Sequence, residues 1–383
     1  MNKYLILTSF VFCFLMGSTQ TVRIGIWRDN NRTDRFYFMT LDESVWMADN
    51  SKITIPANKT LYFTSKDGKI RLSTAEKVYG LYNTVRSISE GNYHLLSLKP
   101  SRTEQIYNGF IEVDTDTLGL QVVNCFKDID NYISGVVEAE TGKEQNKEFY
   151  KAQATISRTF AMSNSRRHEA EGFNLCDQVH CQVYHGVSRF NPDIKLATEE
   201  TAGEVIVDPE INLITASFHS NCGGITTNSE DVWSKSLPYL RSITDTFCVS
   251  GVHYSWDHHI DSEKWLNHLS KQYAMSITDF ERSDLLQFES TSRERFLQFN
   301  STRIERKEIR SKWDLKSTFF DSTIKGDEII LNGRGHGHGV GLCQEGAMEM
   351  SRIGYKYAEI LQFYYTDVHL IHKTMMDFFK DGQ

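Results

Sequence analysis

The sequence predicts an α+β fold, with a mainly β N-terminal part followed by a mixed α/β body. Short apolar runs separated by Asn, Asp, Gly and Ser turns fill the first third of the chain, to about residue 125. A long amphipathic helical pattern follows at 147–166, and strand and helix patterns then alternate. With 40% hydrophobic and 24% charged residues among 383, the chain has ample material for a core.

The chain divides into three predicted parts. Residues 1–20 carry one charge, Lys3, before an apolar run and a few small or polar residues, a pattern typical of a secretory signal peptide. Residues 21–105 are expected to form a β-rich region and residues 106–372 the main domain. A transmembrane anchor needs roughly 20 apolar residues, and no later stretch offers them. We therefore expect export to the periplasm or cell envelope, without a transmembrane anchor.

Periodicity predicts the individual elements in order. Residues 22–27 alternate like a strand, and 132–140 form an apolar, strand-like run. The helix at 147–166 has no interior Gly or Pro, and its apolar residues recur at three- and four-residue steps. Three later elements are expected: strands around a turn at Asp208-Pro209 within 201–218, a helix at 262–272 and a short helix at 357–365.

The net charge and the cysteines limit the kinds of partner and of cross-link that the chain can have. The formal net charge is -8, which argues against nucleic acid as a partner because phosphate binding needs a basic face. Of seven cysteines, one lies in the predicted signal peptide, so six remain, and an even number permits disulfides. Cys176 and Cys181 lie close together with His168 and His180 nearby, a spacing that a zinc ion can also use.

Two carboxylates, Glu138 and Glu140, stand at the end of the apolar run and just before the amphipathic helix. A carboxyl group in such a place is expected to be partly desolvated. Burial disfavours the charged form and raises the pKa, as a general acid working near neutral pH requires.

Two segments resemble the signatures of the sporulation stage II protein D (SpoIID/LytB) family. The first is Asn131 to Glu140 followed by Lys151 to Phe160, and it places the family's catalytic glutamate at Glu140 and a variable position at Glu138. The second is Gly333 to Ala347, where Cys343 replaces the usual Ser. Further fragments match in order, and the resemblance spans Tyr107 to Leu370.

The second signature is rich in glycine. Residues Gly335, Gly337, Gly339 and Gly341 have period two, so an extended chain would present a bare glycine face and project His336 and His338 on the opposite side. A bare face permits close approach of another group. Within the family pattern we expect this segment to line an open substrate cleft in the α/β body.

The resemblance implies a peptidoglycan lytic transglycosylase. Such an enzyme cleaves the bond between N-acetylmuramic acid and N-acetylglucosamine in glycan strands, preferably strands stripped of stem peptides. Glu140 would protonate the glycosidic oxygen and then accept the proton of the sugar's own 6-hydroxyl as a 1,6-anhydro ring closes. An ordinary glycosidase needs two carboxyls, but an internal nucleophile removes that need. No cofactor is required for this chemistry.

Other residues of the matched motifs are candidate site residues. Arg158 is expected to orient Glu140 or a substrate carboxyl, its alternative being a surface helix charge. The remaining candidates are expected to meet sugar hydroxyls or rings, with core packing as the alternative for each: Gln182, Tyr184, Trp233, His336, His338 and Gln344.

Some members of this family carry zinc beside the cleft. Here His168, Cys176 and Cys181 are the expected ligands, with His180 as the alternative histidine, and zinc would hold the loop near Glu140 rather than perform the chemistry. A disulfide between Cys176 and Cys181, or elsewhere between Cys222 and Cys248, is the competing interpretation.

Two other functions compete with the transglycosylase. Some relatives stimulate a cell-wall amidase, so a non-catalytic peptidoglycan-binding module with an amidase partner is the main alternative. A zinc hydrolase is the third, but the sequence has no H-E-x-x-H motif or comparable ligand triad.

Overall fold

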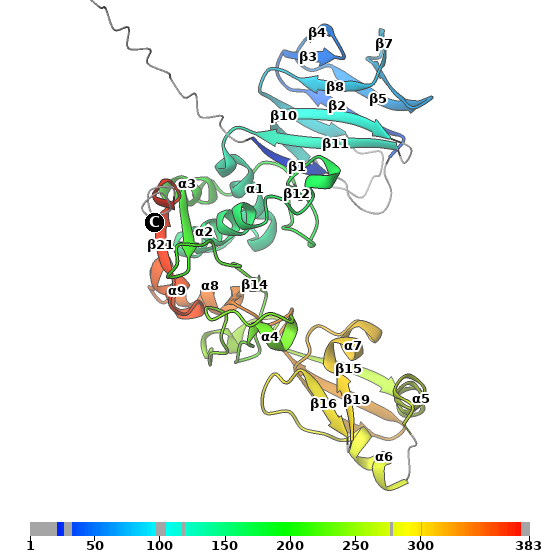
Figure 1. Ribbon diagram of the computed structural model, residues 1–383, viewed down its shortest axis with the longest axis vertical. Coiled ribbons are helices and arrows are strands. Elements are labelled where there is room, and N and C mark those ends of the chain that lie inside the picture. Colours follow the sequence, from blue (N-terminus) through cyan, green and yellow to red (C-terminus); the bar gives the residue numbers. More distant parts are fainter. Residues whose placement is uncertain are drawn as a thin grey trace, which may run out of the picture.

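The computed structural model describes residues 21–26, 33–96, 105–116, 119–275, 279–299 and 301–376. The predicted signal peptide at 1–20 lies outside the described residues. Three parts follow one another along the longest axis: a curled β-sheet, a body of packed helices and a smaller α/β lobe (Figure 1). The α+β class is therefore confirmed. In the described part of the chain, every helix is too short or too polar to span a bilayer.

The N-terminal sheet has twelve strands, and its main path runs β12-β1-β11-β10-β9-β2-β5-β6-β7, with β3, β4 and β8 attached at the side. Apolar and polar residues alternate along its strands, so that Phe36 and Phe38 of β2 face inward. The ring of Phe36 stacks on that of Phe63 of β5, with 4.6 Å between the ring centroids. The strands are β1 Val22–Ile26, β2 Arg35–Thr40, β3 Ser44–Ala48, β4 Ser51–Ile55, β5 Thr60–Lys66, β6 Lys69–Ser73, β7 Val78–Tyr82, β8 Thr84–Ser87, β9 Gly91–Leu96, β10 Gln105–Asp116, β11 Gly119–Phe126 and β12 Leu175–Cys176.

The sheet extends past the predicted limit at residue 105. Strand β10 begins there, pairs with β9 on one side and continues against β11 on the other. The short strand β12 then joins the sheet from much later in the chain, pairing with β1 in parallel through Gly25 and Cys176. The loop around Cys176 is thus anchored to the edge of the sheet.

The middle body is built around helix α2, whose residues are buried on almost every side against α1, α3, α8, α9 and β13. Its predicted helix is confirmed, although it ends at Ser163, and the short helix predicted at 357–365 is confirmed as α9. The elements are α1 Ile129–Thr141, α2 Lys147–Ser163, α3 Pro192–Glu200, β13 Glu204–Val207, β14 Phe218–His219, α4 Ser229–Val232, β20 Leu342–Cys343, α8 Gln344–Arg352, α9 Tyr357–Tyr364 and β21 His369–His372, with 3₁₀ turns at Glu169–Glu171 and Phe247–Ser250.

One expectation in this region is wrong, because the strand-like run at 132–140 lies inside helix α1. Its buried residues recur with helical spacing: Ile129, Tyr132, Ile133, Val136 and Val137. The side chain of Asp128 caps the helix by accepting the N–H of Asp130 at 3.0 Å. The β-branched Ile and Val residues favoured a strand, but burial of this apolar stripe against α2 and α3 decides the outcome.

The third part is a lobe formed by residues 255–334, with a hydrophobic core of its own around Trp265 and Leu269. Ser255 pairs with Arg334 in the register of β15 and β19, so the chain enters and leaves the lobe side by side. The helix predicted at 262–272 is confirmed as α5. The elements are β15 Ser255–Asp261, α5 Ser262–Tyr273, α6 Asp279–Leu286, β16 Phe296–Phe299, β17 Thr302–Glu305, α7 Arg306–Lys312, β18 Phe320–Lys325 and β19 Glu328–Arg334.

Candidate catalytic and metal-binding site

Glu140 lies in the last turn of α1, with its side chain half-buried. Its Oε1 accepts the backbone N–H of Val183 at 2.7 Å. Burial raises the pKa of Glu140, and the hydrogen bond from Val183 opposes this only in part. A carboxyl group with a raised pKa and one oxygen held in place can deliver a proton from the other oxygen.

Glu138 makes different contacts, although it lies only two residues before Glu140 in the same helix. Its carboxylate accepts the hydroxyl of Ser188 at 2.9 Å and the backbone N–H groups of Arg189 and Phe190 at 3.0 and 2.9 Å. These bonds fasten the loop after Val183 to α1. Glu138 is therefore committed to the structure of the loop, while Glu140 has a single partner among the described residues.

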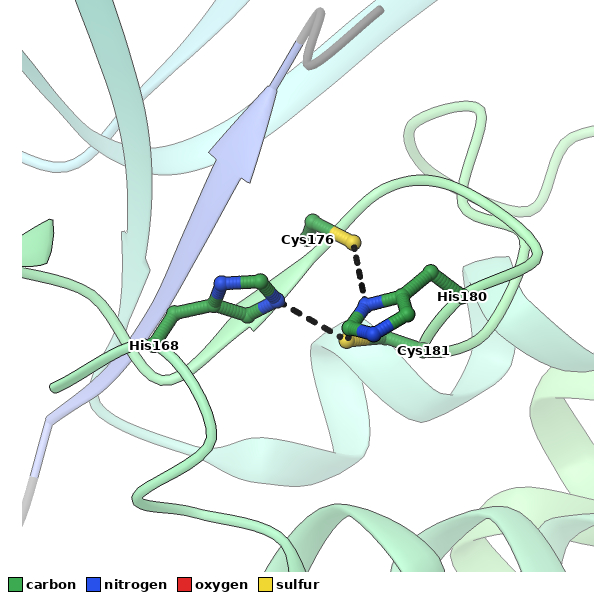
Figure 2. Close-up of side chains that lie close together, drawn as sticks. All are labelled: His168, Cys176, His180 and Cys181. Atoms are coloured by element: carbon green, nitrogen blue, oxygen red, sulfur yellow. Dashed lines mark hydrogen bonds between the residues drawn. The ribbon is translucent and has the colours of Figure 1, made fainter.

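Four metal-ligand side chains converge beside this loop, namely His168, Cys176, His180 and Cys181, here called the His–Cys cluster (Figure 2). Cys181 Sγ lies 3.4 Å from His168 Nε2 and 3.7 Å from His180 Nδ1, and Cys176 Sγ lies 3.9 Å from His180 Nδ1. The six described cysteines are all free thiols, so the structure contains no Cys176–Cys181 disulfide.

The His–Cys cluster fits zinc. A tetrahedral Zn²⁺ with Zn–S near 2.3 Å and Zn–N near 2.0 Å separates its ligand atoms by about 3.5 Å, close to the distances seen here. Cys181 and the two histidines lower the pKa of Cys176 to about 4. A low pKa favours the thiolate, which is the form in which a cysteine binds zinc. The other ring nitrogen of His168, Nδ1, lies 2.5 Å from Oε1 of Glu171, the kind of carboxylate partner that orients metal-bound histidines.

The His–Cys cluster and Glu140 are linked through three consecutive residues. Cys181 belongs to the cluster, Gln182 follows it, and Val183 then donates its N–H to Glu140. Whatever fixes Cys181 therefore also fixes the donor that holds the candidate acid.

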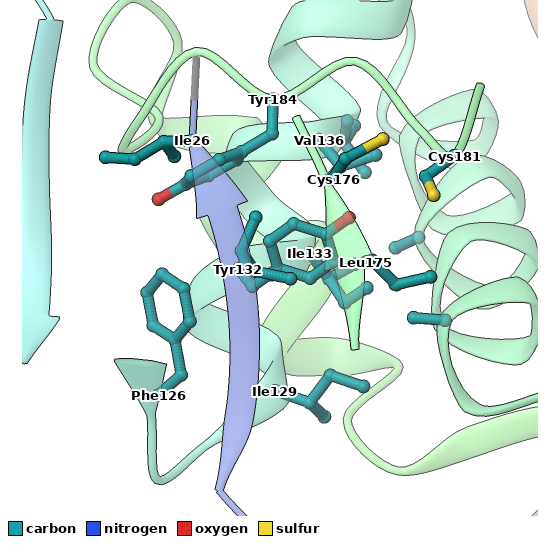
Figure 3. Close-up of a cluster of buried hydrophobic side chains, with 14 of the residues drawn as sticks. Ile26, Phe126, Ile129, Tyr132, Ile133, Val136, Leu175, Cys176, Cys181 and Tyr184 are labelled. Atoms are coloured by element: carbon teal, nitrogen blue, oxygen red, sulfur yellow. The ribbon is translucent and has the colours of Figure 1, made fainter. Parts of the chain in front are cut away.

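Tyr184 is part of the core and not a stacking platform for sugar. Its side chain is fully buried, and its ring lies 5.1 Å from that of Tyr132 and 6.1 Å from that of Phe126 (Figure 3). Its hydroxyl donates to Oδ1 of Asn124 at 3.1 Å. The prediction that Tyr184 contacts substrate is therefore wrong, because this aromatic cluster fills the space between α1 and the sheet.

Gln182 and Gln344 are also buried, with 1% and 6% of their surface exposed. Gln344 donates to Oε1 of Gln153 at 3.3 Å, Gln153 donates to the hydroxyl of Ser157 at 3.3 Å, and Gln182 donates to the carbonyl of Ser157 at 3.3 Å. Gln182 and Gln344 were predicted to contact sugar, but their side chains are used in this chain of hydrogen bonds instead. It joins the glycine-rich signature and the loop before Val183 to the same face of α2.

The prediction that Arg158 orients Glu140 is not supported by its contacts. The guanidinium is fully buried and donates to Asp130 at 2.7 Å, to the carbonyl of Glu204 at 3.0 Å and to that of Thr198 at 3.3 Å. These bonds tie α2 to the start of α1, to the end of α3 and to β13. Arg158 thus acts at the opposite end of α1 from Glu140.

The glycine-rich segment is not extended, because each of its four alternating glycines has a positive φ between 71° and 104°. The close approach predicted from the missing side chains is present. The guanidinium of Arg293, from the lobe, fills the space where Cβ atoms of Gly335 and Gly339 would stand, and it donates to the carbonyl of Cys222 at 2.7 Å. The segment therefore forms a packed contact between the body and the lobe, here called the glycine-rich seam.

His338 lies at that seam, and burial lowers its pKa to about 4. Its Nδ1 accepts the N–H of Val340 at 3.0 Å, and its ring lies 5.3 Å from that of Trp233, which is 38% exposed. A cavity of about 70 Å³ opens beside it, lined in part by Arg306 and Arg310. His336 keeps some exposed surface and lies 5.1 Å from the ring of His253. In the described part of the chain, neither predicted histidine has a recorded contact with Glu140.

Comparison with known proteins identifies relatives of this chain. The family model described as stage II sporulation protein matches residues 116–207, which include α1, α2 and the His–Cys cluster. An uncharacterized protein of Brachyspira hyodysenteriae is 28% identical over 63% of this chain and 66% of its own length. The stage II sporulation protein D of Bacillus amyloliquefaciens is 29% identical over 63% and 74%. An amidase enhancer of Bacillus subtilis is 27% identical over 61% of this chain but only 39% of its own length.

Proposed function

Because the chain belongs to the SpoIID family through its domain at 116–207, we propose that it cleaves peptidoglycan glycan strands as a lytic transglycosylase. The observation that carries this proposal is the state of Glu140, a half-buried carboxyl whose pKa is raised by burial and whose Oε1 is held by Val183. The protein would act outside the cytoplasm, in the periplasm or cell envelope where its substrate lies.

The chemistry needs one carboxyl group that works twice. Protonated Glu140 donates from its free oxygen to the glycosidic oxygen as the bond to the muramic acid C1 breaks. The resulting carboxylate then accepts the proton of the 6-hydroxyl, whose oxygen closes on C1 to form the 1,6-anhydro ring. A raised pKa suits both steps, because the same group must hold a proton first and take one back afterwards.

The residues of this chain position that carboxyl group. The Val183 N–H keeps one oxygen of Glu140 occupied, so the other is directed to substrate. We propose that zinc occupies the His–Cys cluster, held by His168, Cys176, His180 and Cys181, where it would cross-link the loop that presents Val183. The transfer steps above use Glu140 alone and no metal-bound group.

Among the predicted substrate contacts, His336, His338 and Trp233 keep exposed surface. We assign them the outer part of a glycan-binding surface at the seam between the body and the lobe. Trp233 offers an apolar ring face for a sugar ring, and His336 offers a nitrogen for a hydroxyl group.

A second function is favoured by the likeness to the amidase enhancer of Bacillus subtilis. On that alternative the chain binds peptidoglycan without cleaving it and stimulates a cell-wall amidase.

The test is incubation of the protein with peptide-stripped glycan strands, followed by mass spectrometry of the products. The wild type is expected to release products with 1,6-anhydro-muramic acid ends, and Glu140→Gln is expected to release none. Glu138→Gln is the matched control, because it changes a carboxyl group of the same helix end that is bonded to the loop. Reducing-end products would instead mean hydrolysis, and absence of cleavage by the wild type would favour the amidase-stimulating module.

A further inference from the structure

A second group of metal-ligand side chains lies away from Glu140, where the two chain segments that flank the lobe meet. It consists of Cys222, Asp245, Cys248 and Cys343, here called the thiol cluster. Cys222 follows β14, Cys343 ends β20, and these strands pair in parallel. All four residues have no exposed surface, and their ligand atoms lie within 4.8 Å of one another.

The ligand atoms of the thiol cluster lie close to the separations of a zinc coordination shell. Cys222 Sγ lies 3.3 Å from Cys248 Sγ and 3.3 Å from Asp245 Oδ2. A tetrahedral zinc ion separates two sulfur ligands by about 3.8 Å and a sulfur from an oxygen ligand by about 3.6 Å, so a small outward movement of the side chains would admit the ion. A disulfide would bring only two sulfurs together, at about 2.05 Å. It would leave the third thiol and the carboxylate without a role.

The carboxylate of Asp245 is oriented as a ligand. Its Oδ1 accepts the N–H of Phe247 at 2.9 Å, and its Oδ2 accepts the hydroxyl of Tyr364 at 2.9 Å. Outer hydrogen bonds of this kind fix the direction of metal-bound carboxylates. Helix α8 packs directly on the group, since a Cβ at Gly346 would overlap both Tyr364 and Asp245.

Three buried thiols and one buried carboxyl group lie together here without a hydrogen bond from a basic side chain among the described residues. Arg293 is the nearby basic side chain, but its recorded hydrogen bonds go to the backbone carbonyl of Cys222 and not to a thiol or to the carboxylate. The thiols themselves therefore have no cation bonded to them in the described part of the chain.

We propose that the thiol cluster binds a zinc ion, separate from the one assigned to the His–Cys cluster. Three cysteine sulfurs and one carboxylate oxygen give the closed four-coordinate set typical of structural zinc. Binding would release the thiol protons and link residues 222, 245–248 and 343. The ion would thereby hold together the two chain segments that flank the lobe, next to the glycine-rich seam.

The test is the zinc content of the purified full chain, measured by inductively coupled plasma mass spectrometry. Cys343→Ser is expected to contain one zinc ion fewer per chain than the wild type, as is Asp245→Asn with its weaker ligand. Cys181→Ser, in the His–Cys cluster, is the matched control, and combined with Cys343→Ser it should lose one ion more. Unchanged zinc content in both Cys343→Ser and Asp245→Asn would overturn the proposal.

A second measurement does not depend on the variants being folded. Thiols of the wild type are counted with a chromogenic reagent after denaturation in chelator, with and without prior reduction. Equal counts are expected, because every cysteine of the thiol cluster remains a thiol. If the unreduced wild type shows two thiols fewer than the reduced protein, and Cys248→Ser shows no such difference, the cluster contains a Cys222–Cys248 disulfide. That result would refute the zinc site.

Discussion

Replacing Arg158 with Met separates the two roles considered for this residue. The change removes the partner of Asp130, which is 15% exposed at its side chain, and the donors to two backbone carbonyls. Breaking a buried ion pair costs about 3–5 kcal/mol. The partial exposure of Asp130 favours the lower end of that range, while the two stranded carbonyls add to it. We therefore expect a loss of about 3–4 kcal/mol in the free energy of unfolding.

The assay is urea unfolding followed by tryptophan fluorescence, with glycan cleavage measured well below the unfolding midpoint. Adding Asp130→Asn to Arg158→Met should recover about 1–2 kcal/mol, because it removes the stranded charge. Cleavage by the folded fraction of Arg158→Met should remain close to that of the wild type. A variant with stability changed by less than about 1 kcal/mol and with cleavage abolished would refute this reasoning. It would place Arg158 on Glu140 or on the substrate.

Three further outcomes follow from the structure. Because burial raises the pKa of Glu140, the wild type should lose stability as the pH rises through and above the ordinary glutamate range. Glu140→Gln should therefore melt at a higher temperature than the wild type at pH 8, and the difference should disappear near pH 4. Calorimetry at the two pH values measures this. Gly339→Ala should lower the free energy of unfolding in urea by about 2–4 kcal/mol, because the new Cβ would overlap Arg293 and the residue has a positive φ. Gly326→Ala is the control, since Gly326 has a positive φ but open space around it, and it should lower the free energy of unfolding by only about 1 kcal/mol. Chelation should speed proteolytic cleavage within 164–183, mapped by mass spectrometry, and equal rates would argue against metal at the His–Cys cluster.

Local sequence spacing was enough to predict the His–Cys cluster as a group. Cys176 and Cys181 are five positions apart, and closing so short a loop costs little conformational entropy. His168 precedes the same short loop, so its convergence needs few other elements. Glu171 was not predicted, because its approach to His168 depends on the 3₁₀ turn at 169–171.

Long-range partners account for the expectations that failed. Arg158 is buried because Asp130 meets it from 28 positions upstream, and Gln344 is buried because Gln153 meets it from 191 positions away. No pattern local to either residue contains that information. The run at 132–140 was misassigned for a related reason, since its β-branched composition is local and the surfaces it packs against are not.

The separation of the lobe was also hidden in the sequence. Residues 255–334 form their own core, and their two connections to the body are the paired ends of β15 and β19. Composition marks a boundary only where the chain between units is flexible.

The place of the lobe within the chain also sets an order of assembly. The body is written in two pieces, and strands β13 and β14 acquire their partners β21 and β20 only when residues 342–372 are present. Until then the lobe can fold on its own core, whereas the body has two unpaired strands and exposed apolar surface. A chain that stops short of residue 340 would therefore contain a finished lobe on an unfinished, aggregation-prone body. Residues 342–372 thus complete the body that residues 129–254 begin, because they supply strands β20 and β21.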